Sequence, residues 1–251
     1  MKNVLLLLFN TITFSGALYL NFLFGSGAGG RKSVGAVSSQ FDTLITPAGY
    51  AFSIWGLIYL LLIGFLLNQW KGFFTGNIKE SLQPTSIWFA ASNIFNGLWI
   101  ILWTQEMLVS SVVAIIGLLV SITVWNSQLN LNNKERSYSV LIDLPVSVYL
   151  GWIIIATVVN ISVWFYANQL LMEYEMIVTA VILIVAVGIL LWLLKEKQLF
   201  APSFIGVWAL IAIAFKNQGN SNYLRILIIL LVLILFISTF LMIKNKKHHL
   251  N

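Results

Sequence analysis

Aromatic and amide side chains recur at helical spacing in three apolar stretches of the chain. Trp55 and Tyr59 are four residues apart, so both rings would leave a helix on the same face. Such rings can form a wall for a flat apolar ligand, and amides in a low-dielectric site can orient it by hydrogen bonds. Packing between helices and interhelical hydrogen bonding are the alternative interpretation, and the pattern leaves both open. The other two stretches carry Asn93, Asn96 and Trp99, and then Tyr149, Trp152, Ala156 and Asn160.

Residues that would support covalent or acid–base catalysis are scarce. The chain has no cysteine, and both histidines, His248 and His249, lie in the basic tail. No pair of acidic residues falls within an apolar stretch, where it could act as a general acid and base. The sequence therefore gives little support for an enzyme, predicts no metal site and requires no obligatory cofactor.

The composition is that of a polytopic membrane protein. Of 251 residues, 59% are hydrophobic and only 9% are charged, which leaves too little polar surface to cover a globule in water. The net charge of +6 comes from basic residues in short loops between apolar runs, which is a topology signal and not a nucleic-acid-binding patch. We expect an all-α helix bundle in contact with the lipid bilayer and no nucleic-acid partner.

Eight apolar runs are predicted to span the membrane, which takes about 20 residues per helix. The first, Val4–Phe24, could instead be the apolar region of a signal peptide, but it is longer than such regions and is expected to be retained. Pro84 suits the first turn of the third helix, because it lacks an N–H that would go unused there. The seven later runs cover approximately residues 47–70, 84–104, 107–128, 145–164, 174–194, 200–215 and 223–243.

Three local features predict structure around these helices. The loop Gly25–Thr46, which opens with GSGAGGRKS, is expected to be flexible. Asp143 is expected just before a helix that begins near Pro145, where a carboxylate can cap free N–H groups. A close packing face is predicted for the run 200–215, because it carries small residues at steps of three: Ser203, Gly206, Ala209 and Ala212.

The basic residues predict the orientation in the membrane. With eight spans, ten Lys and Arg residues fall on the side of the two termini and four fall on the other side. The positive-inside rule then places both termini in the cytoplasm and the loop Gly25–Thr46 outside. The Lys-, Asn- and Ile-rich composition and the lack of a transit peptide make the cytoplasmic membrane of a bacterium the expected location.

These stretches, in their order along the chain, resemble the TspO/MBR family of tryptophan-rich sensory proteins and eukaryotic translocator proteins. The second helix of that family begins with a Pro pair and continues to a Trp and, four residues later, a Tyr. Pro47, Trp55 and Tyr59 match this pattern, and Trp70-Lys71 matches a pair found in some members. The third and fifth helices match at Asn96, Trp99 and Trp103, and at Tyr149, Trp152, Ala156, Asn160 and Trp164.

The resemblance covers about residues 1–168, for which it implies a TspO-like five-helix transmembrane bundle. Residues 169–251 then form about three additional transmembrane helices and a basic cytoplasmic tail. The resemblance also implies a pocket near the first loop that takes planar hydrophobic ligands, such as porphyrins or other tetrapyrroles and, in eukaryotic members, sterols and synthetic drugs. The residues that match pocket-lining positions are Trp55, Asn96, Trp152 and Ala156.

Two functions follow as hypotheses. The first is an integral membrane receptor or sensor that binds a small planar hydrophobic ligand, such as a porphyrin- or haem-type tetrapyrrole. The alternative is a membrane carrier for a hydrophobic or amphipathic metabolite, with the three added helices completing its pathway. The sequence leaves open which natural ligand is bound and whether the bundle is a homodimer. The predicted ligand-binding residues are Trp55, Tyr59, Asn93, Asn96, Trp99, Tyr149, Trp152, Ala156 and Asn160.

Overall fold

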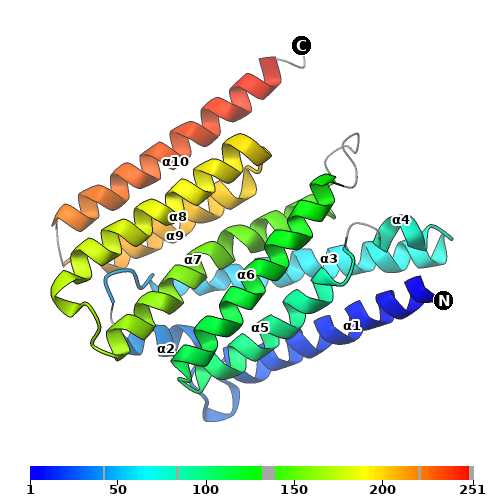
Figure 1. The fold of residues 1–251 in the computed structure, drawn as a ribbon, viewed down its shortest axis with the longest axis horizontal. Helices are drawn as coiled ribbons and strands as arrows, with labels where there is room; N and C mark the ends of the chain where they lie inside the picture. The colour runs from blue at the N-terminus through cyan, green and yellow to red at the C-terminus, as the bar shows by residue number, and fades with distance from the viewer. Residues whose placement is uncertain (42, 83–84, 132–138, 220–221, 249–251) are drawn as a thin grey trace.

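The protein is an all-α bundle, as predicted (Figure 1). The computed structural model describes residues 1–41, 43–82, 85–131, 139–219 and 222–248, and these residues form helices and connecting turns without a β-strand. The predictions for Pro84 and for His249 fall outside these ranges. The N-terminus and the C-terminal end of the last helix lie toward the end of the bundle away from the short helix α2 (Val34–Gln40) (Figure 1).

Long helices occupy all eight predicted positions. Between them lie two short helices, α2 (Val34–Gln40) and α4 (Ile78–Leu82), and the single-turn helices η1 (Asn21–Gly25), η2 (Ala28–Gly30), η3 (Gly49–Ser53) and η4 (Met172–Tyr174). The long helices are α1 (Lys2–Leu20), α3 (Ile54–Phe74), α5 (Trp88–Thr104), α6 (Leu108–Leu131), α7 (Asp143–Ala167), α8 (Glu175–Lys197), α9 (Ala201–Lys216) and α10 (Asn222–His248).

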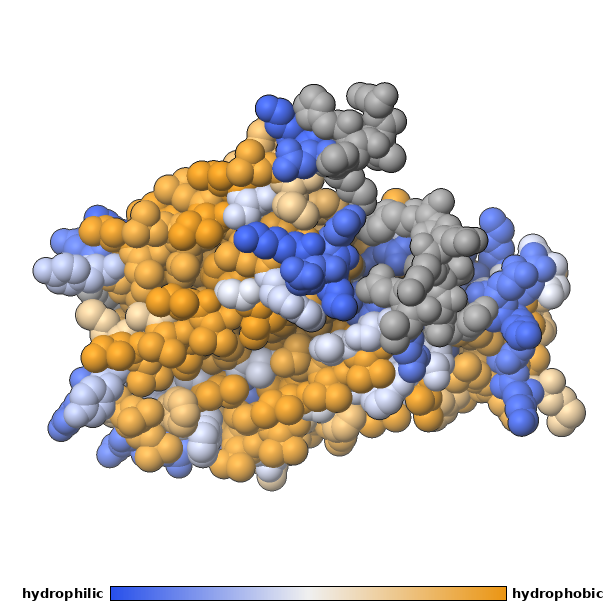
Figure 2. Space-filling model, turned by 45° about the horizontal axis from the view of Figure 1, so that its top comes forward, coloured by the Kyte–Doolittle hydropathy of each residue, from blue (hydrophilic) through white to orange (hydrophobic). Residues whose placement is uncertain are grey.

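The helices and the outer surface are those of an integral membrane protein. Among the described helices, six are long and apolar enough to cross a bilayer: α1, α3, α6, α7, α8 and α10. Helices α5 and α9 are shorter, at 17 and 16 residues. The face seen in Figure 2 is mostly hydrophobic, as expected of a surface that contacts lipid.

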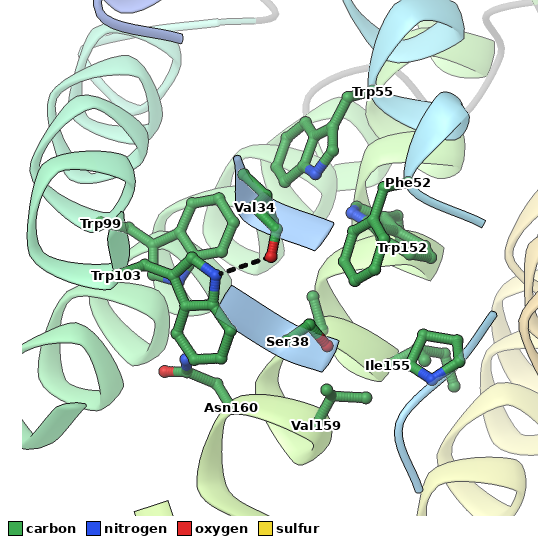
Figure 3. A pocket seen from close by; sticks show the side chains of 12 residues that line it. Val34, Ser38, Phe52, Trp55, Trp99, Trp103, Trp152, Ile155, Val159 and Asn160 are labelled. Carbon is green, nitrogen blue, oxygen red and sulfur yellow. Dashed lines mark hydrogen bonds between the residues drawn. The ribbon is translucent and has the colours of Figure 1, made fainter. Parts of the chain in front are cut away.

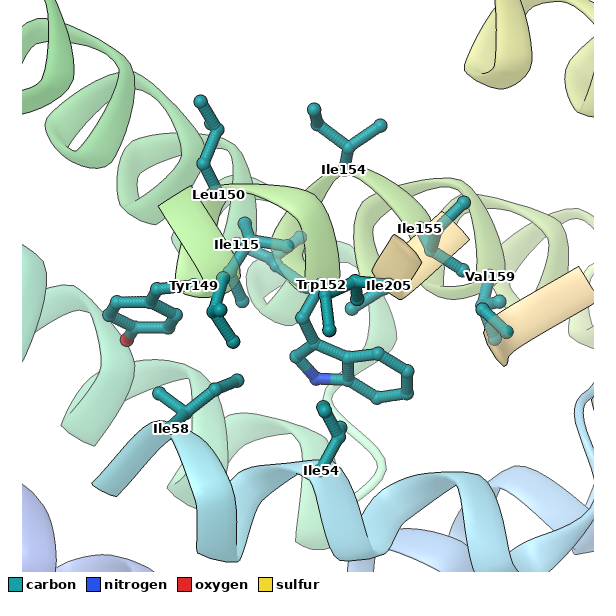
Figure 4. Packing of buried hydrophobic residues seen from close by; sticks show 14 of the residues in the cluster. Ile54, Ile58, Ile115, Tyr149, Leu150, Trp152, Ile154, Ile155, Val159 and Ile205 are labelled. Atoms are coloured by element: carbon teal, nitrogen blue, oxygen red, sulfur yellow. The ribbon is translucent and has the colours of Figure 1, made fainter. Parts of the chain in front are cut away.

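Helix α7 lies at the centre of the bundle. It packs against α3 and α6 on one side and against α8 and α9 on the other. In its most apolar stretch 83% of the residues are buried, against 22–39% in the other five spans. Figure 4 shows Tyr149 and Trp152 of α7 among isoleucines of α3, α6 and α9. Because α7 is in contact with both halves of the bundle, it can connect a site in one half with the other half.

The C-terminal helices pack closely on α7. A Cβ atom built on Gly151 would lie only 2.6 Å from Pro202 Cα, so a residue larger than glycine would push the backbones of α7 and α9 apart. The small residues of α9 lie inside, which confirms the predicted packing face: Ser203, Gly206, Ala209 and Ala212 are all buried.

The first loop contains more structure than predicted. The expectation of a flexible loop over Gly25–Thr46 is wrong for its middle, where α2 forms. Ser33 caps this helix, its Oγ accepting a hydrogen bond from the backbone N–H of Ala36 at 3.1 Å. Val34 and Val37 are buried beneath the helix. A cap and two buried valines therefore stabilise a helix too short to be recognised by its periodicity.

The start of α7 also differs from the prediction. The helix begins at Asp143, two residues before Pro145. The Asp143 carboxylate accepts a hydrogen bond from the backbone N–H of Ser139 at 2.6 Å. This bond closes the turn that precedes the helix.

Candidate functional site

A cavity lies where α2, η3, α3, α5 and α7 meet (Figure 3). Its volume, measured as the space that the centre of a water-sized sphere can occupy, is about 20 Å³. That is room for about one water molecule. The residues that line it are Val34, Ser38, Pro47, Phe52, Trp55, Trp99, Trp103, Trp152, Ile155, Ala156, Val159 and Asn160.

Trp55 is the centre of the aromatic cluster around this cavity. It is the second residue of α3, and its indole stacks on Trp99 of α5 with ring centroids 5.5 Å apart and on Tyr59 at 5.6 Å. The Trp152 indole of α7 meets it edge-on at 6.3 Å. Three helices thus contribute rings in the stacked and edge-on geometries that aromatic pairs prefer.

Trp103 connects α5 to the first loop. Its indole N–H donates a hydrogen bond to the carbonyl oxygen of Val34 at 3.2 Å (Figure 3). Val34 is the first residue of α2, so this bond holds the helix against the cavity. Gly35 follows, and a Cβ there would meet the Phe52 ring at 3.4 Å. Helix α2 therefore forms one side of the cavity and is in contact with Phe52, which lines the opposite side.

Helix α7 supplies the polar end of the cavity. Asn160 is buried, and its Oδ1 accepts a hydrogen bond from the Ser111 hydroxyl of α6 at 3.2 Å. This bond orients the amide. Ala156, one helical turn earlier, has a side chain too small to fill the space beside Trp152.

Apart from the Trp103 indole, which is bonded to Val34, the buried N–H donors of the cavity-lining aromatic and amide side chains share one property. The indole N–H groups of Trp55, Trp99 and Trp152 and the side-chain amide N–H groups of Asn160 find no acceptor among the described residues. A buried donor without an acceptor costs about 1–3 kcal/mol, so most native structures avoid it. The surface of the cavity is apolar, and the residues that line it carry buried donors that an acceptor-bearing molecule could satisfy if it reached them.

Five of the nine predicted site residues line the cavity: Trp55, Trp99, Trp152, Ala156 and Asn160. Tyr149 lies behind them, with its ring edge-on to Trp55 at 6.0 Å. Tyr59 lines a neighbouring chamber described below. Their roles in ligand binding stay predictions.

The other two predicted residues, Asn93 and Asn96, face α1 and its extension η1. Asn21 of η1 donates a hydrogen bond to Asn96 Oδ1 at 2.6 Å. Asn93 Nδ2 lies 3.5 Å from the hydroxyl of Thr13 in α1. These contacts match the alternative interpretation, in which the amides bond between helices.

Several lining residues were not predicted. Phe52 is three residues before Trp55, Trp103 is four after Trp99, and Ile155 is three after Trp152, so helical spacing from the aromatic residues could have identified them. Val34 and Ser38 of α2 are also four apart. Their signal was hidden because the segment was predicted to be a loop.

A second chamber adjoins the cavity and is open to the outside. By the same measure its volume is about 300 Å³. It shares Val34, Phe52 and Trp55 with the cavity, so these three side chains form a partition between the two spaces. Its other lining residues come from η1 and the residue after it, from α2 and its cap, from η3 and from α3: Asn21, Gly25, Ser26, Ser33, Gly35, Gly49 and Tyr59.

A polar cluster on the surface also holds α2. We call it the Glu106 cluster: Lys32, Gln40 and Glu106. Lys32 forms an ion pair with Glu106, which lies in the turn between α5 and α6, and Gln40 Nε2 donates to the other carboxylate oxygen at 3.0 Å. The hydrogen bond from Lys32 is the main reason why the pKa of the Glu106 carboxyl lies below its usual value of 4.5, and Gln40 adds to the effect. One carboxylate thus contacts residues at both ends of α2.

The fold and this cavity define a class: a polytopic α-helical membrane protein with an aromatic cavity inside the bundle. A family model described as TSPO-like protein matches residues 7–241, and the chain belongs to this family. The match continues past residue 168, where the motif resemblance ends, through α8 and α9 into α10. The chain matches no curated protein and no solved structure.

Proposed function

We propose that the protein is a membrane receptor or sensor that binds a planar, largely hydrophobic ligand in this cavity, a porphyrin or another tetrapyrrole being the representative case. The observation that carries the proposal is the set of buried donors without protein acceptors around the aromatic cluster. Flat rings would stack on or meet the indoles, each contact contributing about 0.5–1.5 kcal/mol beyond burial. Acceptor atoms of the ligand would satisfy the indole and amide N–H groups.

Water alone is a poor explanation for these donors. The cavity has room for about one water molecule, which can accept about two hydrogen bonds. The donor groups belong to four residues on three helices. A ligand with several acceptors therefore satisfies the site better than water does.

The positions of charged residues indicate which parts of the ligand should be neutral and which can be charged. Among the described residues that line the cavity none is charged, so the acceptors that enter it are expected to be neutral, such as carbonyl or imine groups. Arg31 and Lys32 precede Ser33, the cap of α2, and both are exposed, with Lys32 paired to Glu106. Carboxylates on the ligand would be stabilised on that side. In this proposal both termini are cytoplasmic and α2 lies on the outer side.

A ligand of this size requires the cavity to open. Ligand pockets usually measure about 300–1,000 Å³, far more than the closed cavity offers. The partition of Val34, Phe52 and Trp55 separates it from a chamber of about 300 Å³. Displacement of α2 would move Val34 and Ser38 and join the two spaces. We therefore expect binding to be coupled to a movement of α2.

The experiment that tests the proposal is a fluorescence titration of the detergent-solubilised protein with protoporphyrin IX. Trp152→Phe keeps a ring but removes the indole N–H, and should weaken saturable quenching about three- to tenfold in Kd. The matched control is Trp192→Phe on α8, because Trp192 is exposed and does not line the cavity. Linear quenching that is alike in all three proteins would mean partition into the micelle and would contradict the proposal.

A further inference from the structure

One wall of the cavity is formed by the chain between α2 and α3. We call the stretch Thr43–Ser53 the wall segment. It contributes Pro47 and Phe52 to the cavity lining, and the edge of the Phe52 ring meets Trp152 at 6.0 Å. Its interior residues Ile45 and Thr46 are completely buried. The position of this segment therefore decides the shape of the cavity.

The wall segment is hydrogen-bonded to the C-terminal helices. Two bonds hold Leu44: its carbonyl accepts from Asn217 Nδ2 at 2.8 Å, and its N–H donates to Glu175 Oε1 at 3.1 Å. Further along, the N–H of Ala48 donates to the carbonyl oxygen of Ala212 in α9 at 3.0 Å. The carbonyl oxygen of Ala51 accepts from the Trp208 indole at 3.4 Å.

Aromatic packing adds to these bonds. Tyr50 lies between two rings of α9, edge-on to Trp208 at 5.2 Å and to Phe215 at 6.1 Å. Helix α9 is in turn fixed on α7 by the close approach at Gly151. The wall segment is therefore held from outside by a helix that is itself packed on the central helix of the bundle.

These contacts provide hydrogen-bond partners for buried backbone N–H and C=O groups, which are costly to leave without a partner. Irregular backbone at membrane depth is tolerated only where protein or water satisfies its N–H and C=O groups. The C-terminal helices supply partners for Leu44, Ala48 and Ala51 from behind the wall. Their partners Asn217, Trp208 and Glu175 do not line the cavity. They can affect a ligand only through the wall segment.

We propose that α8, α9 and the turn after α9 hold the wall segment in its cavity-forming position, with Asn217, Trp208 and Glu175 as positioning residues. The added helices then set the ligand affinity of a cavity that they do not line, a step that rests on the function proposed above. Because the wall is ordered before the ligand arrives, binding does not bear the cost of ordering it. Release of the wall segment should therefore weaken binding.

A buried thiol can report on the wall without any ligand. The chain has no cysteine, so Thr46→Cys places a single thiol within the wall segment, at a completely buried position. Its labelling rate by a small maleimide measures how often the segment opens. Ala90→Cys, at a completely buried position on α5, measures global opening in the same way.

Asn217→Ala and Trp208→Phe each remove one bond to the wall. Each should raise the labelling of the Thr46→Cys thiol about three- to tenfold and raise the Kd for protoporphyrin IX by a similar factor, while the Ala90→Cys thiol reacts as before. The matched controls are Asn168→Ala, whose amide bonds only within its own helix end, and Trp192→Phe. Both controls should leave both reporters unchanged.

Each other outcome counts against the proposal. Unchanged labelling at Thr46→Cys would show that the C-terminal helices do not hold the wall. Equal acceleration at both thiols would show loss of global stability in place of a positioning role. Faster labelling of the wall with an unchanged Kd would overturn the link to affinity. If the wild type itself fails to bind protoporphyrin saturably, the proposed function is wrong, and the labelling rates still decide whether the wall is held.

Discussion

The cavity lies between two walls that are held in different ways. On one side, α2 is connected to α5 by a buried hydrogen bond from Trp103 and to the α5–α6 turn by the Glu106 cluster. The ion pair of that cluster is partly exposed, with Lys32 51% and Glu106 32% accessible, so it contributes only about 0–1 kcal/mol. On the other side, the wall segment has four hydrogen bonds and two aromatic contacts with α8, α9 and the turn after α9.

This difference indicates where the cavity opens. A short helix with one buried bond and a partly exposed ion pair should separate from its neighbours more easily than a segment that is hydrogen-bonded to four residues of the C-terminal part of the chain. The side chains of α2 also form part of the partition to the open chamber. We therefore expect α2 to move when ligand enters and the wall segment to stay in place.

The largest effect is expected from a change that separates α9 from α7. Gly151→Ala places a methyl group 2.6 Å from Pro202 Cα, and this backbone atom cannot move independently of α9. Such overpacking costs about 1–3 kcal/mol, so labelling of the Thr46→Cys thiol should rise about tenfold or more. The measurement is the maleimide rate in the double variant Gly151→Ala, Thr46→Cys.

The control for this prediction is another helical glycine. Gly188 of α8 has nothing within 4 Å of a built Cβ, so Gly188→Ala should leave the wall as it is and slightly favour the helix. If Gly151→Ala labels no faster than Gly188→Ala, the wall does not depend on the packing between α7 and α9.

A smaller effect is expected on the α2 side. Glu106→Gln removes the charge that holds Lys32 and should raise the labelling of a Ser38→Cys thiol on α2 by at most about fivefold. The Thr46→Cys thiol should not respond. Glu196→Gln on the exposed end of α8 is the matched control. A response of the wall segment equal to that of α2 would remove the distinction between the two walls.

The pH dependence offers a second test of the same cluster. Since the folded pKa of Glu106 is below its usual value of 4.5, the ion pair stabilises α2 fully above that value and is lost as the pH falls through the lower folded pKa. The ratio of the Ser38→Cys rate to the Thr46→Cys rate should stay constant from neutral pH down to about 4.5 and rise below it. The ratio cancels the pH dependence of the thiol reaction. A Glu106→Gln background should abolish the rise.

The long helices could be predicted because apolar runs of bilayer length leave few alternatives. The spacing of Trp55, Trp99 and Trp152 also predicted rings that meet at one place, and the structure brings them together. Periodicity defines a helix face but not the neighbour of that face. Asn93 and Asn96 share a face with Trp99 along α5, yet they contact α1 and η1, a difference that the sequence alone could not give.

The two walls could not be predicted for other reasons. Helix α2 is only seven residues long. Two buried valines and a Ser33 cap are too few residues to show a helical periodicity in the sequence. The wall segment depends on partners more than 130 residues away, such as Glu175 and Asn217. Neither partner lies in a motif. Each bonds to a backbone group of Leu44, and because every residue carries such groups, the side chain at that position does not reveal the contact.

The labelling rates of Ser38→Cys and Thr46→Cys in the otherwise unchanged, ligand-free protein compare the two walls directly. Both positions have a hydroxyl side chain and both are completely buried, one on each wall. Static burial alone predicts equal rates. We expect the Ser38→Cys thiol to react about tenfold faster, because α2 opens while the C-terminal helices hold the wall segment. Equal rates, or a faster reaction at Thr46→Cys, would contradict this expectation.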